Sequence, residues 1–289
     1  MRFFILAAGY GKRAQPLSFV KPKPLFPLNG VPVVQILLQQ LNKKGLKEGF
    51  INLFYKAQAI REVTGSSSGI EYLYEEELSG SKILKEAAAK IDDYLLVVNG
   101  DMFLEIPLQE MQQKIETSGY DGVLLLRRSQ ESGYPTVRLE DGIYAGRIKN
   151  GRQGMLMYTG AALFKIEALE LIDEINFFDS FDKYRPRVGA VVYRGPWLDI
   201  GTPRSYLAAD REYRAYVKAP GSNSLSKHVE ISPGSEVEGS IIWENTVIRG
   251  GSKISGCIVT GDIVLEDADY RDKIISPGAG GRVSTFDIG

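Results

Sequence analysis

The chain has 289 residues, of which 44% are apolar and 25% are charged, and its net charge is -1. These values are typical of an ordinary globular protein, and they argue against binding to nucleic acid or to a membrane through bulk charge. A single cysteine, Cys257, and a single histidine, His228, exclude a disulfide framework, a cysteine-based zinc cluster and most catalytic triads. Any chemistry must therefore depend on Asp, Glu, Lys, Arg and backbone amides.

The apolar run near the start, residues 3–8, is too short for the apolar region of a signal peptide, and Lys12 and Arg13 follow soon after it. No apolar run approaches the length of a membrane span. We therefore expect a cytoplasmic protein.

Short β-rich runs alternate with helical patterns up to about residue 130. Segments of these lengths in alternation predict an α/β fold, a doubly wound, mostly parallel sheet with helices on both faces. Residues 136–158 hold strands without helices, which indicates an antiparallel excursion. The predicted strands are 2–7, 50–55, 70–74, 94–98, 122–126 and 188–193, and the predicted helices are 32–44, 82–91, 108–117, 166–175 and 203–217.

The pattern changes after Lys218, where a linker-like stretch leads into a repeat. Residues 231–247 match residues 248–264 at a constant offset of seventeen, with aliphatic residues about every six positions. A β-hairpin would also alternate Ile and Val, but it would not produce this match between copies. The repeat predicts a short β-helix of stacked coils. We expect a catalytic domain at 1–218, the β-helix at 226–275 and a tail at 276–289.

The stretch "LAAGYGKRA" follows the first predicted strand and fits the dinucleotide-binding pattern G-x-G-x-x-A through Gly9, Gly11 and Ala14. That fingerprint requires a helix that begins within the motif and an acidic residue about twenty positions later. Pro16 interrupts any such helix, and no acidic residue occurs before Glu48. The dinucleotide interpretation therefore fails on its context.

A phosphate-binding loop without a helix explains the same stretch better. Glycines after a strand let successive backbone N–H groups approach anionic oxygens. Arg13 adds a fixed charge that can grip two oxygens, and the prolines place Lys23 back across the same cavity. The alternative, a solvated basic loop, is the interpretation we accept for Lys12 and Lys21.

Two acidic residues complete a candidate site. Asp101 comes just after a buried strand in "VVNGD", and Asp199 lies in a short turn in "WLDIGTP". Ligands bind at the carboxyl ends of strands in open α/β sheets. Neither acid has a local cation partner in the sequence, so both are plausible ligands for Mg²⁺, which prefers oxygen. Each alone could equally form a turn or cap a helix.

The ordered motifs "LAAGYGKR", "KPKPLFPLNGVPVV", "VVNGD", "YTGAALF" and "WLDIGTP" resemble those of the sugar-phosphate nucleotidylyltransferases. The resemblance covers nearly the whole chain. It implies a Rossmann-like nucleotidyltransferase domain, often followed in this family by a left-handed β-helix, and a reaction that joins an NTP to a sugar 1-phosphate and releases pyrophosphate. It also implies Mg²⁺ as cofactor. The net charge predicts no nucleic-acid or membrane partner, and a β-helix this short could pair with a second copy to form a homo-oligomer. The sequence looks closest to the branch that handles mannose-like, heptose-like or N-acetylmuramic sugar phosphates.

The resemblance also implies a role for each matching residue. Arg13 would hold the leaving pyrophosphate, and Lys23 would bind the α-phosphate or the sugar phosphate. Asp101 and Asp199 would ligate Mg²⁺, and Gly160 would let the backbone approach the sugar. The nucleotide would be bound by Leu6, Ala7, Ala8, Gly9, Gly11, Gly80, Ser81, Asn99 and Gly100.

The chain departs from the family pattern in two places. "LSGSKIL", residues 78–84, replaces the small-residue run near the base pocket, and the E-K-P motif, whose lysine grips the sugar phosphate, is missing. Lys149 or Arg152 could contact the sugar phosphate instead. These departures leave a second hypothesis, a catalytically silent relative that regulates or scaffolds. An acyltransferase is disfavoured because two β-helix coils offer little surface.

Overall fold

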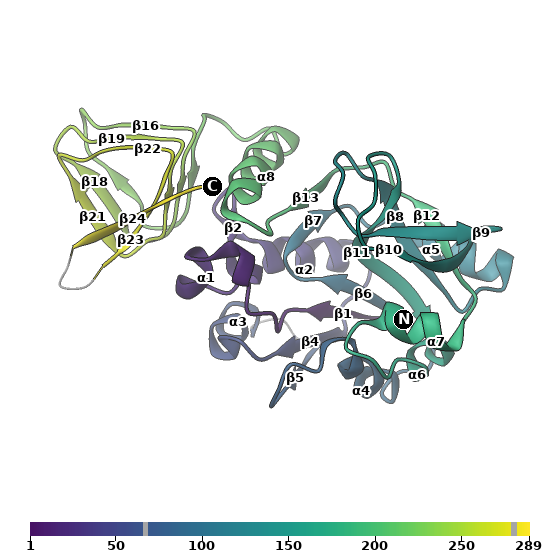
Figure 1. Ribbon diagram of the computed structural model, residues 1–289. Coiled ribbons are helices and arrows are strands. Elements are labelled where there is room, and N and C mark those ends of the chain that lie inside the picture. The colour runs from purple at the N-terminus through teal and green to yellow at the C-terminus, as the bar shows by residue number, and fades with distance from the viewer. Residues whose placement is uncertain (66–68, 279–281) are drawn as a thin grey trace.

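A computed structural model describes residues 1–65, 69–278 and 282–289. Seven strands form its central sheet in the order β12-β8-β11-β6-β1-β4-β5 (Figure 1). Neighbouring strands are parallel, except that β11 runs antiparallel to β6 and β8. The mostly parallel sheet is therefore confirmed. Its strands are β1 (Arg2–Leu6), β4 (Gly49–Leu53), β5 (Ile70–Tyr74), β6 (Tyr94–Asn99), β8 (Gly122–Arg128), β11 (Leu156–Lys165) and β12 (Val188–Val192).

Helices pack on both faces of this sheet, as predicted. One core cluster contains apolar residues of α2 (Val33–Lys43), α3 (Ala57–Thr64) and α5 (Leu108–Ser118). The other contains residues of α4 (Leu84–Ala88), α6 (Ile166–Glu170) and α7 (Phe177–Tyr184). The sequence did not predict α3 or α7, and the helix expected at 166–175 ends at Glu170. No helix in the described ranges is both long and apolar enough to cross a bilayer.

Short elements complete the larger part of the chain. β9 and β10 pair as an antiparallel hairpin, which is the excursion expected at 136–158. β13 pairs antiparallel with β7 beside the carboxyl end of β6. These elements are α1 (Leu17–Val20), β2 (Pro27–Leu28), β3 (Val31–Pro32), β7 (Met102–Leu104), β9 (Thr136–Glu140), β10 (Ile143–Ile148), β13 (Trp197–Asp199) and α8 (Pro203–Tyr216), with 3-10 turns at Lys12–Ala14, Lys23–Leu25 and Gly80–Ile83.

The C-terminal part forms the predicted β-helix, seen as a triangular coil in Figure 1. The pairing register reproduces the seventeen-residue offset, since Ile231 faces Ile248, Val237 faces Ile254 and Ile241 faces Ile258. Its parallel strands are β14 (Ser224–Leu225), β15 (Glu230–Ile231), β16 (Glu236–Glu238), β17 (Ile241–Ile242), β18 (Thr246–Arg249), β19 (Lys253–Ser255), β20 (Ile258–Val259), β21 (Ile263–Glu266), β22 (Asp269–Arg271) and β23 (Lys273–Pro277).

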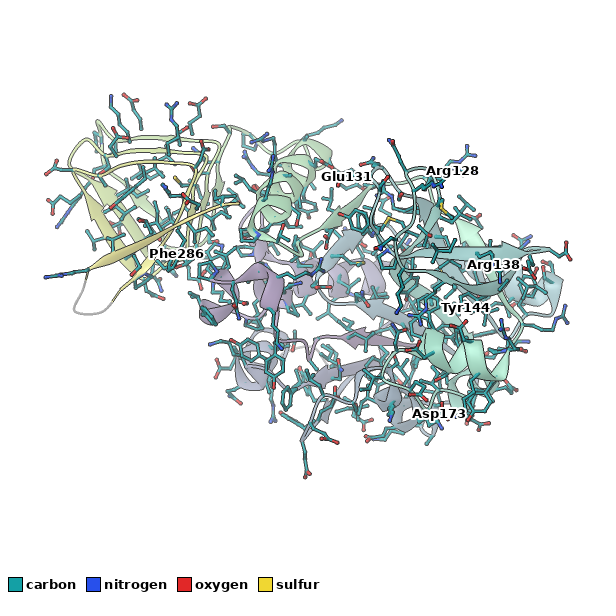
Figure 2. The ribbon with its side chains drawn as sticks, viewed as in Figure 1. Arg128, Glu131, Arg138, Tyr144, Asp173 and Phe286 are labelled. Atoms are coloured by element: carbon teal, nitrogen blue, oxygen red, sulfur yellow. The ribbon has the colours of Figure 1, made fainter. Side chains whose placement is uncertain are left out.

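The segment expected to be a tail belongs to the β-helix. Strand β24 (Val283–Asp287) pairs antiparallel with β23, so the chain folds back along the last coil. Phe286 lies on this edge strand with 45% of its surface exposed (Figure 2).

The β-helix and the α/β part share one hydrophobic cluster. Trp243 is fully buried and packs against Phe26, with ring centroids 5.3 Å apart. Its indole nitrogen donates to the Tyr206 hydroxyl (3.1 Å), which donates to the Pro27 carbonyl (2.7 Å). The linker-like stretch is also held, because the Arg214 guanidinium donates to the carbonyls of residues 220 and 221. The two parts therefore pack as one body.

Candidate active site

A side chain from β4, the strand that pairs with β1, anchors the loop after β1. Asn52, buried on β4, accepts a hydrogen bond from the Ala7 backbone N–H (2.6 Å). Gly11 has a positive φ of 64°, and a side chain there would meet Lys23 Cγ at 3.2 Å. Glycine at this position therefore allows both the left-handed turn and the return of Lys23 across the loop.

This loop forms one wall of a cavity of about 550 Å³ at the carboxyl ends of β1 and β6. Ten of the predicted site residues line it: Leu6, Ala7, Ala8, Gly9, Gly11, Lys23, Gly80, Ser81, Asn99 and Asp101. The remaining lining residues are Pro24, Asn52, Glu75, Leu78, Tyr158, Ile175, Asn176, Phe177 and Phe178. The tertiary structure thus gathers segments from seven separate parts of the chain around one space.

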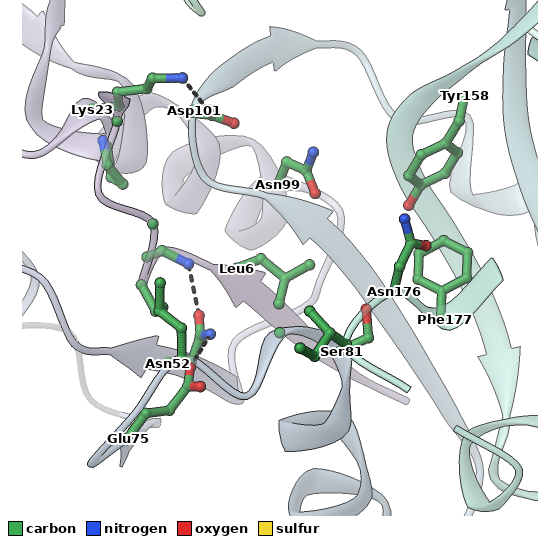
Figure 3. A pocket seen from close by; sticks show the side chains of 18 of the residues that line it. Leu6, Lys23, Asn52, Glu75, Ser81, Asn99, Asp101, Tyr158, Asn176 and Phe177 are labelled. Atoms are coloured by element: carbon green, nitrogen blue, oxygen red, sulfur yellow. Dashed lines mark hydrogen bonds and ion pairs between the residues drawn. The ribbon is translucent and has the colours of Figure 1, made fainter. Parts of the chain in front are cut away.

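Lys23 and Asp101 form an ion pair inside this cavity. The ammonium of Lys23 lies 3.1 Å from Asp101 Oδ2, and the lysine side chain is buried (Figure 3). Asp101 has no cation partner nearby in the sequence, but the fold brings Lys23 to it from 78 positions away. The pair is only partly buried, because one third of the Asp101 side chain is exposed, and the contact sets two opposite charges side by side in the cavity.

Asp199 lies beside this pair, although it does not line the cavity. Strand β13 places Asp199 opposite Met102, next in the chain to Asp101. Burial raises the pKa of the Asp199 carboxyl, and the negative charge of Asp101 raises it further. Asp199 Oδ1 accepts from the Gly201 N–H (3.0 Å). Two carboxylates therefore converge at one edge of the sheet.

Arg13 reaches the same corner from the glycine-rich loop. Its Nη2 lies 3.1 Å from the point that a side chain on Gly201 would occupy, and both carboxylate oxygens of Asp199 lie within 3.0 Å of that point. The residue is exposed and outside the cavity lining. Its guanidinium therefore lies near Asp199, outside the cavity lining.

The other predicted residues do not line the cavity. Gly100 is buried, and a side chain there would meet Ile5 Cγ2 and the Leu6 carbonyl at 3.0 Å. Gly160 has a φ of 91°, and Met102 occupies the space of its missing side chain. Gly160 thus makes room for neighbouring side chains. Lys149 is exposed and does not line the cavity.

A polar network that the sequence analysis missed lies at one end of the cavity. The Asn52 side-chain amide donates to Glu75 Oε1 (2.6 Å), and Glu75 Oε2 accepts from the Ser79 backbone N–H (2.7 Å). The one feature of the sequence that could have indicated this network is Asn52, a polar residue within an otherwise apolar strand. The network fixes the glycine-rich loop relative to residues 78–81.

The segment that departs from the family pattern, residues 78–84, still forms part of the cavity wall. Gly80 has a φ of 61°, and Ile175 leaves no room for a side chain there. The Ser81 N–H donates to the Ile175 carbonyl (2.7 Å). This contact joins the wall formed by residues 78–81 to the segment before α7.

The sequence analysis also missed an aromatic wall at the end of the cavity opposite the Asn52–Glu75 network. Tyr158 on β11 meets Phe177 and Phe178 at the start of α7 edge to face, with ring centroids 5.5 and 5.4 Å apart. Asn176 caps this helix by accepting from the Phe178 N–H (3.0 Å). α7 was not predicted, so no sequence pattern brought these residues to the site.

Comparison with known proteins identifies the class to which this fold and site belong. Residues 3–150 match the family model described as nucleotidyl transferase. The chain belongs to this family.

Among its relatives, the D-glycero-alpha-D-manno-heptose 1-phosphate guanylyltransferase of Aneurinibacillus thermoaerophilus is 24% identical, over 75% of this chain and 100% of the relative. The mannose-1-phosphate guanylyltransferase 1 of Arabidopsis thaliana is 22% identical, over 92% and 76%. A crystal structure of HddC from Yersinia pseudotuberculosis, complexed with GMP-PN, has a TM-score of 0.64 at 23% identity and covers 73% of this chain and 99% of that one. The structural likeness concerns the fold.

Proposed function

We propose that this protein is a sugar-phosphate nucleotidyltransferase, which joins an NTP to a sugar 1-phosphate and releases pyrophosphate. The observation that carries the proposal is the Lys23–Asp101 pair beside Asp199, at the carboxyl edge of the sheet and next to the glycine-rich loop. An NTP and a sugar phosphate bring several negative charges together, and this site offers a buried lysine, a glycine-rich loop in the cavity wall and an arginine near Asp199.

The reaction needs no general base. An oxygen of the sugar phosphate is already anionic, attacks the α-phosphorus of the NTP, and displaces pyrophosphate as the bond between the α-phosphorus and its bridging oxygen breaks. The amides of Gly9 and Gly11 would bind the triphosphate, Lys23 the α-phosphate, and Arg13 the departing pyrophosphate. Catalysis then consists of positioning and charge stabilisation.

The acidic residues fit Mg²⁺. Asp101 and Asp199 lie close enough for one charge to raise the pKa of the other, a repulsion that a bound cation would relieve. Mg²⁺ commonly binds through one or two protein carboxylates together with substrate phosphates. When bound, the ion would neutralise charge on the phosphate oxygens.

For the substrates, we propose GTP and a mannose-like or heptose-like 1-phosphate. Two relatives carry names of guanylyltransferases that act on such sugar phosphates. At the Asn52 end of the cavity, Glu75 is the acid that lines the wall, and a carboxylate there can accept hydrogen bonds from the N–H groups of guanine. This end would therefore bind the base.

Pyrophosphate release from a matrix of five NTPs against a panel of sugar 1-phosphates tests the proposal. We expect turnover with GTP and a mannose-like or heptose-like 1-phosphate, lost when Mg²⁺ is chelated. Asp101→Asn is the matched control, because it keeps the size of the side chain and removes its charge. No pyrophosphate from any pair would contradict the proposal and favour a silent relative.

A further inference from the structure

A smaller cavity, of about 200 Å³, is lined by three arginines. Arg127 and Arg128 end strand β8, and Arg194 follows strand β12. These strands are parallel neighbours, so their carboxyl ends meet at the same edge of the sheet. The remaining lining residues are Val192, Tyr193 and Gly195. This cavity shares no lining residue with the candidate active site.

The positive charge of this cavity is not neutralised by the protein residues that the structure describes. No acidic residue is among the lining residues. None of the three arginines takes part in the ion pairs found among the described residues. Glu212 on α8 acts on Arg127 through its charge, but from outside the lining. An anion bound between the arginines would relieve the repulsion among like charges.

Two of the guanidinium groups are held in place. The Arg127 Cζ atom lies 4.9 Å from the centroid of the Trp197 ring, and its Nη1 donates to the Trp197 carbonyl (3.3 Å). The Nη1 of Arg128 donates to the Gly154 carbonyl (2.9 Å). Because these contacts already order both side chains, an anion that binds here loses less free energy to immobilising them.

Arg127 retains hydrogen-bond donors for a ligand. It is half-buried, and burial lowers the pKa of its guanidinium, since a charge is partly removed from water without a counter-ion. Its Nε and Nη2 atoms make no hydrogen bond found among the described residues, and neither is one of the unpaired polar atoms sealed from solvent. These N–H groups are therefore accessible from outside the protein.

The turn that carries Arg194 is also fixed. The Tyr193 hydroxyl accepts from the Glu105 backbone N–H (3.0 Å) and donates to the Pro196 carbonyl (2.8 Å). A side chain at Gly195 would meet the Tyr193 hydroxyl at 2.5 Å, so this close approach requires glycine. The Arg194 side chain is exposed and lines the cavity, so its guanidinium is available to an anion there.

We propose that this cavity binds a phosphate group, at a site separate from the candidate active site. The N–H groups of a guanidinium match phosphate oxygens in both geometry and charge, and three such groups gather here. The volume is well below the 550 Å³ of the active-site cavity, which suits one phosphate group better than a whole nucleotide. Free inorganic phosphate and a phosphate ester share this chemistry. The inference does not depend on the proposed function.

Calorimetric titration of the full chain with inorganic phosphate, at constant ionic strength and without Mg²⁺, tests the site. We expect saturable binding that chloride does not reproduce. Arg194→Gln should weaken it about tenfold or more, the usual effect of losing one hydrogen bond between charged groups. Arg271→Gln is the matched control, because it removes an exposed arginine from β22 of the β-helix, and it should leave the affinity unchanged.

Inorganic phosphate can also meet Lys23, so the titration is repeated with Lys23→Gln. We expect the binding to persist in this variant. Its loss in Lys23→Gln, with Arg194→Gln unaffected, would place the phosphate in the active site and overturn the inference. Wild-type protein that shows no saturable binding, or that binds chloride equally, would overturn it as well.

A hexose 6-phosphate, titrated in the same way, distinguishes the two sources of phosphate. Binding at least as tight as that of inorganic phosphate, and weakened in Arg194→Gln, would identify a phosphate ester as the ligand. Binding of inorganic phosphate alone would identify the free ion. Pyrophosphate release by wild-type protein that binds no phosphate here would overturn this inference and leave the proposed function standing. Phosphate binding without turnover of any substrate pair would do the reverse.

Discussion

Replacing Trp243 with alanine is expected to destabilise the whole chain, although Trp243 belongs to the β-helix. The side chain is fully buried between the two parts of the chain, against Phe26 and Tyr206. Burial of an aromatic side chain removes roughly 200 Å² from water, worth about 5 kcal/mol at about 25 cal/mol per Å². Since measured Trp→Ala costs are about 3–5 kcal/mol, we expect a loss of about 4 kcal/mol in the free energy of unfolding.

For a chain of this size the unfolding entropy is about 0.6 kcal/mol/K, so such a loss lowers the thermal midpoint by about 7 °C. Scanning calorimetry together with circular dichroism should show one transition, shifted as a unit. The control is Phe286→Ala, an exposed aromatic residue on the same β-helix, which should cost less than about 1 kcal/mol. Two transitions, with the α/β part melting at its wild-type temperature, would refute the shared core and show that the parts are stable independently.

Three further substitutions probe the site. Asp199→Asn should abolish metal-dependent pyrophosphate release yet raise the thermal midpoint at pH 7 without metal. The pKa of Asp199 is raised in the folded state, so stability falls as pH rises through the window between its unfolded and folded pKa values, and Asn removes that decline. A lower midpoint would contradict this. Gly80→Ala should cost about 2 kcal/mol in urea unfolding and raise the KM for NTP, because Ile175 and the positive φ both oppose a side chain; wild-type values would be inconsistent with a left-handed turn at this position. Arg13→Lys should lower kcat by roughly one to three orders of magnitude with a smaller change in the KM for NTP, since the charge remains but the two-pronged grip is lost. Steady-state kinetics would reject this role if only KM rose.

The local sequence pattern was sufficient to predict the parallel sheet and the β-helix. Alternating β and α segments predicted the parallel sheet, because each strand must bury both faces under helices. The seventeen-residue repeat predicted the pairing of Ile241 with Ile258, because equal spacing stacks like residues in successive coils. The glycines and the lysine of the first loop were also predicted as site residues, and they line the cavity. They could be recognised because the turn and the charge belong to one short stretch of the sequence.

Contacts between distant segments decided the rest. The eight-residue helices α3 and α7 were missed because helices of that length are marginal alone and form only through tertiary packing. The pairing of Lys23 with Asp101 spans 78 positions, and the approach of Asp199 depends on the register of β13 against β7. The sequence could not show that the Tyr158 hydroxyl lacks a partner among the described residues, because pairing depends on every neighbour that the fold brings to it.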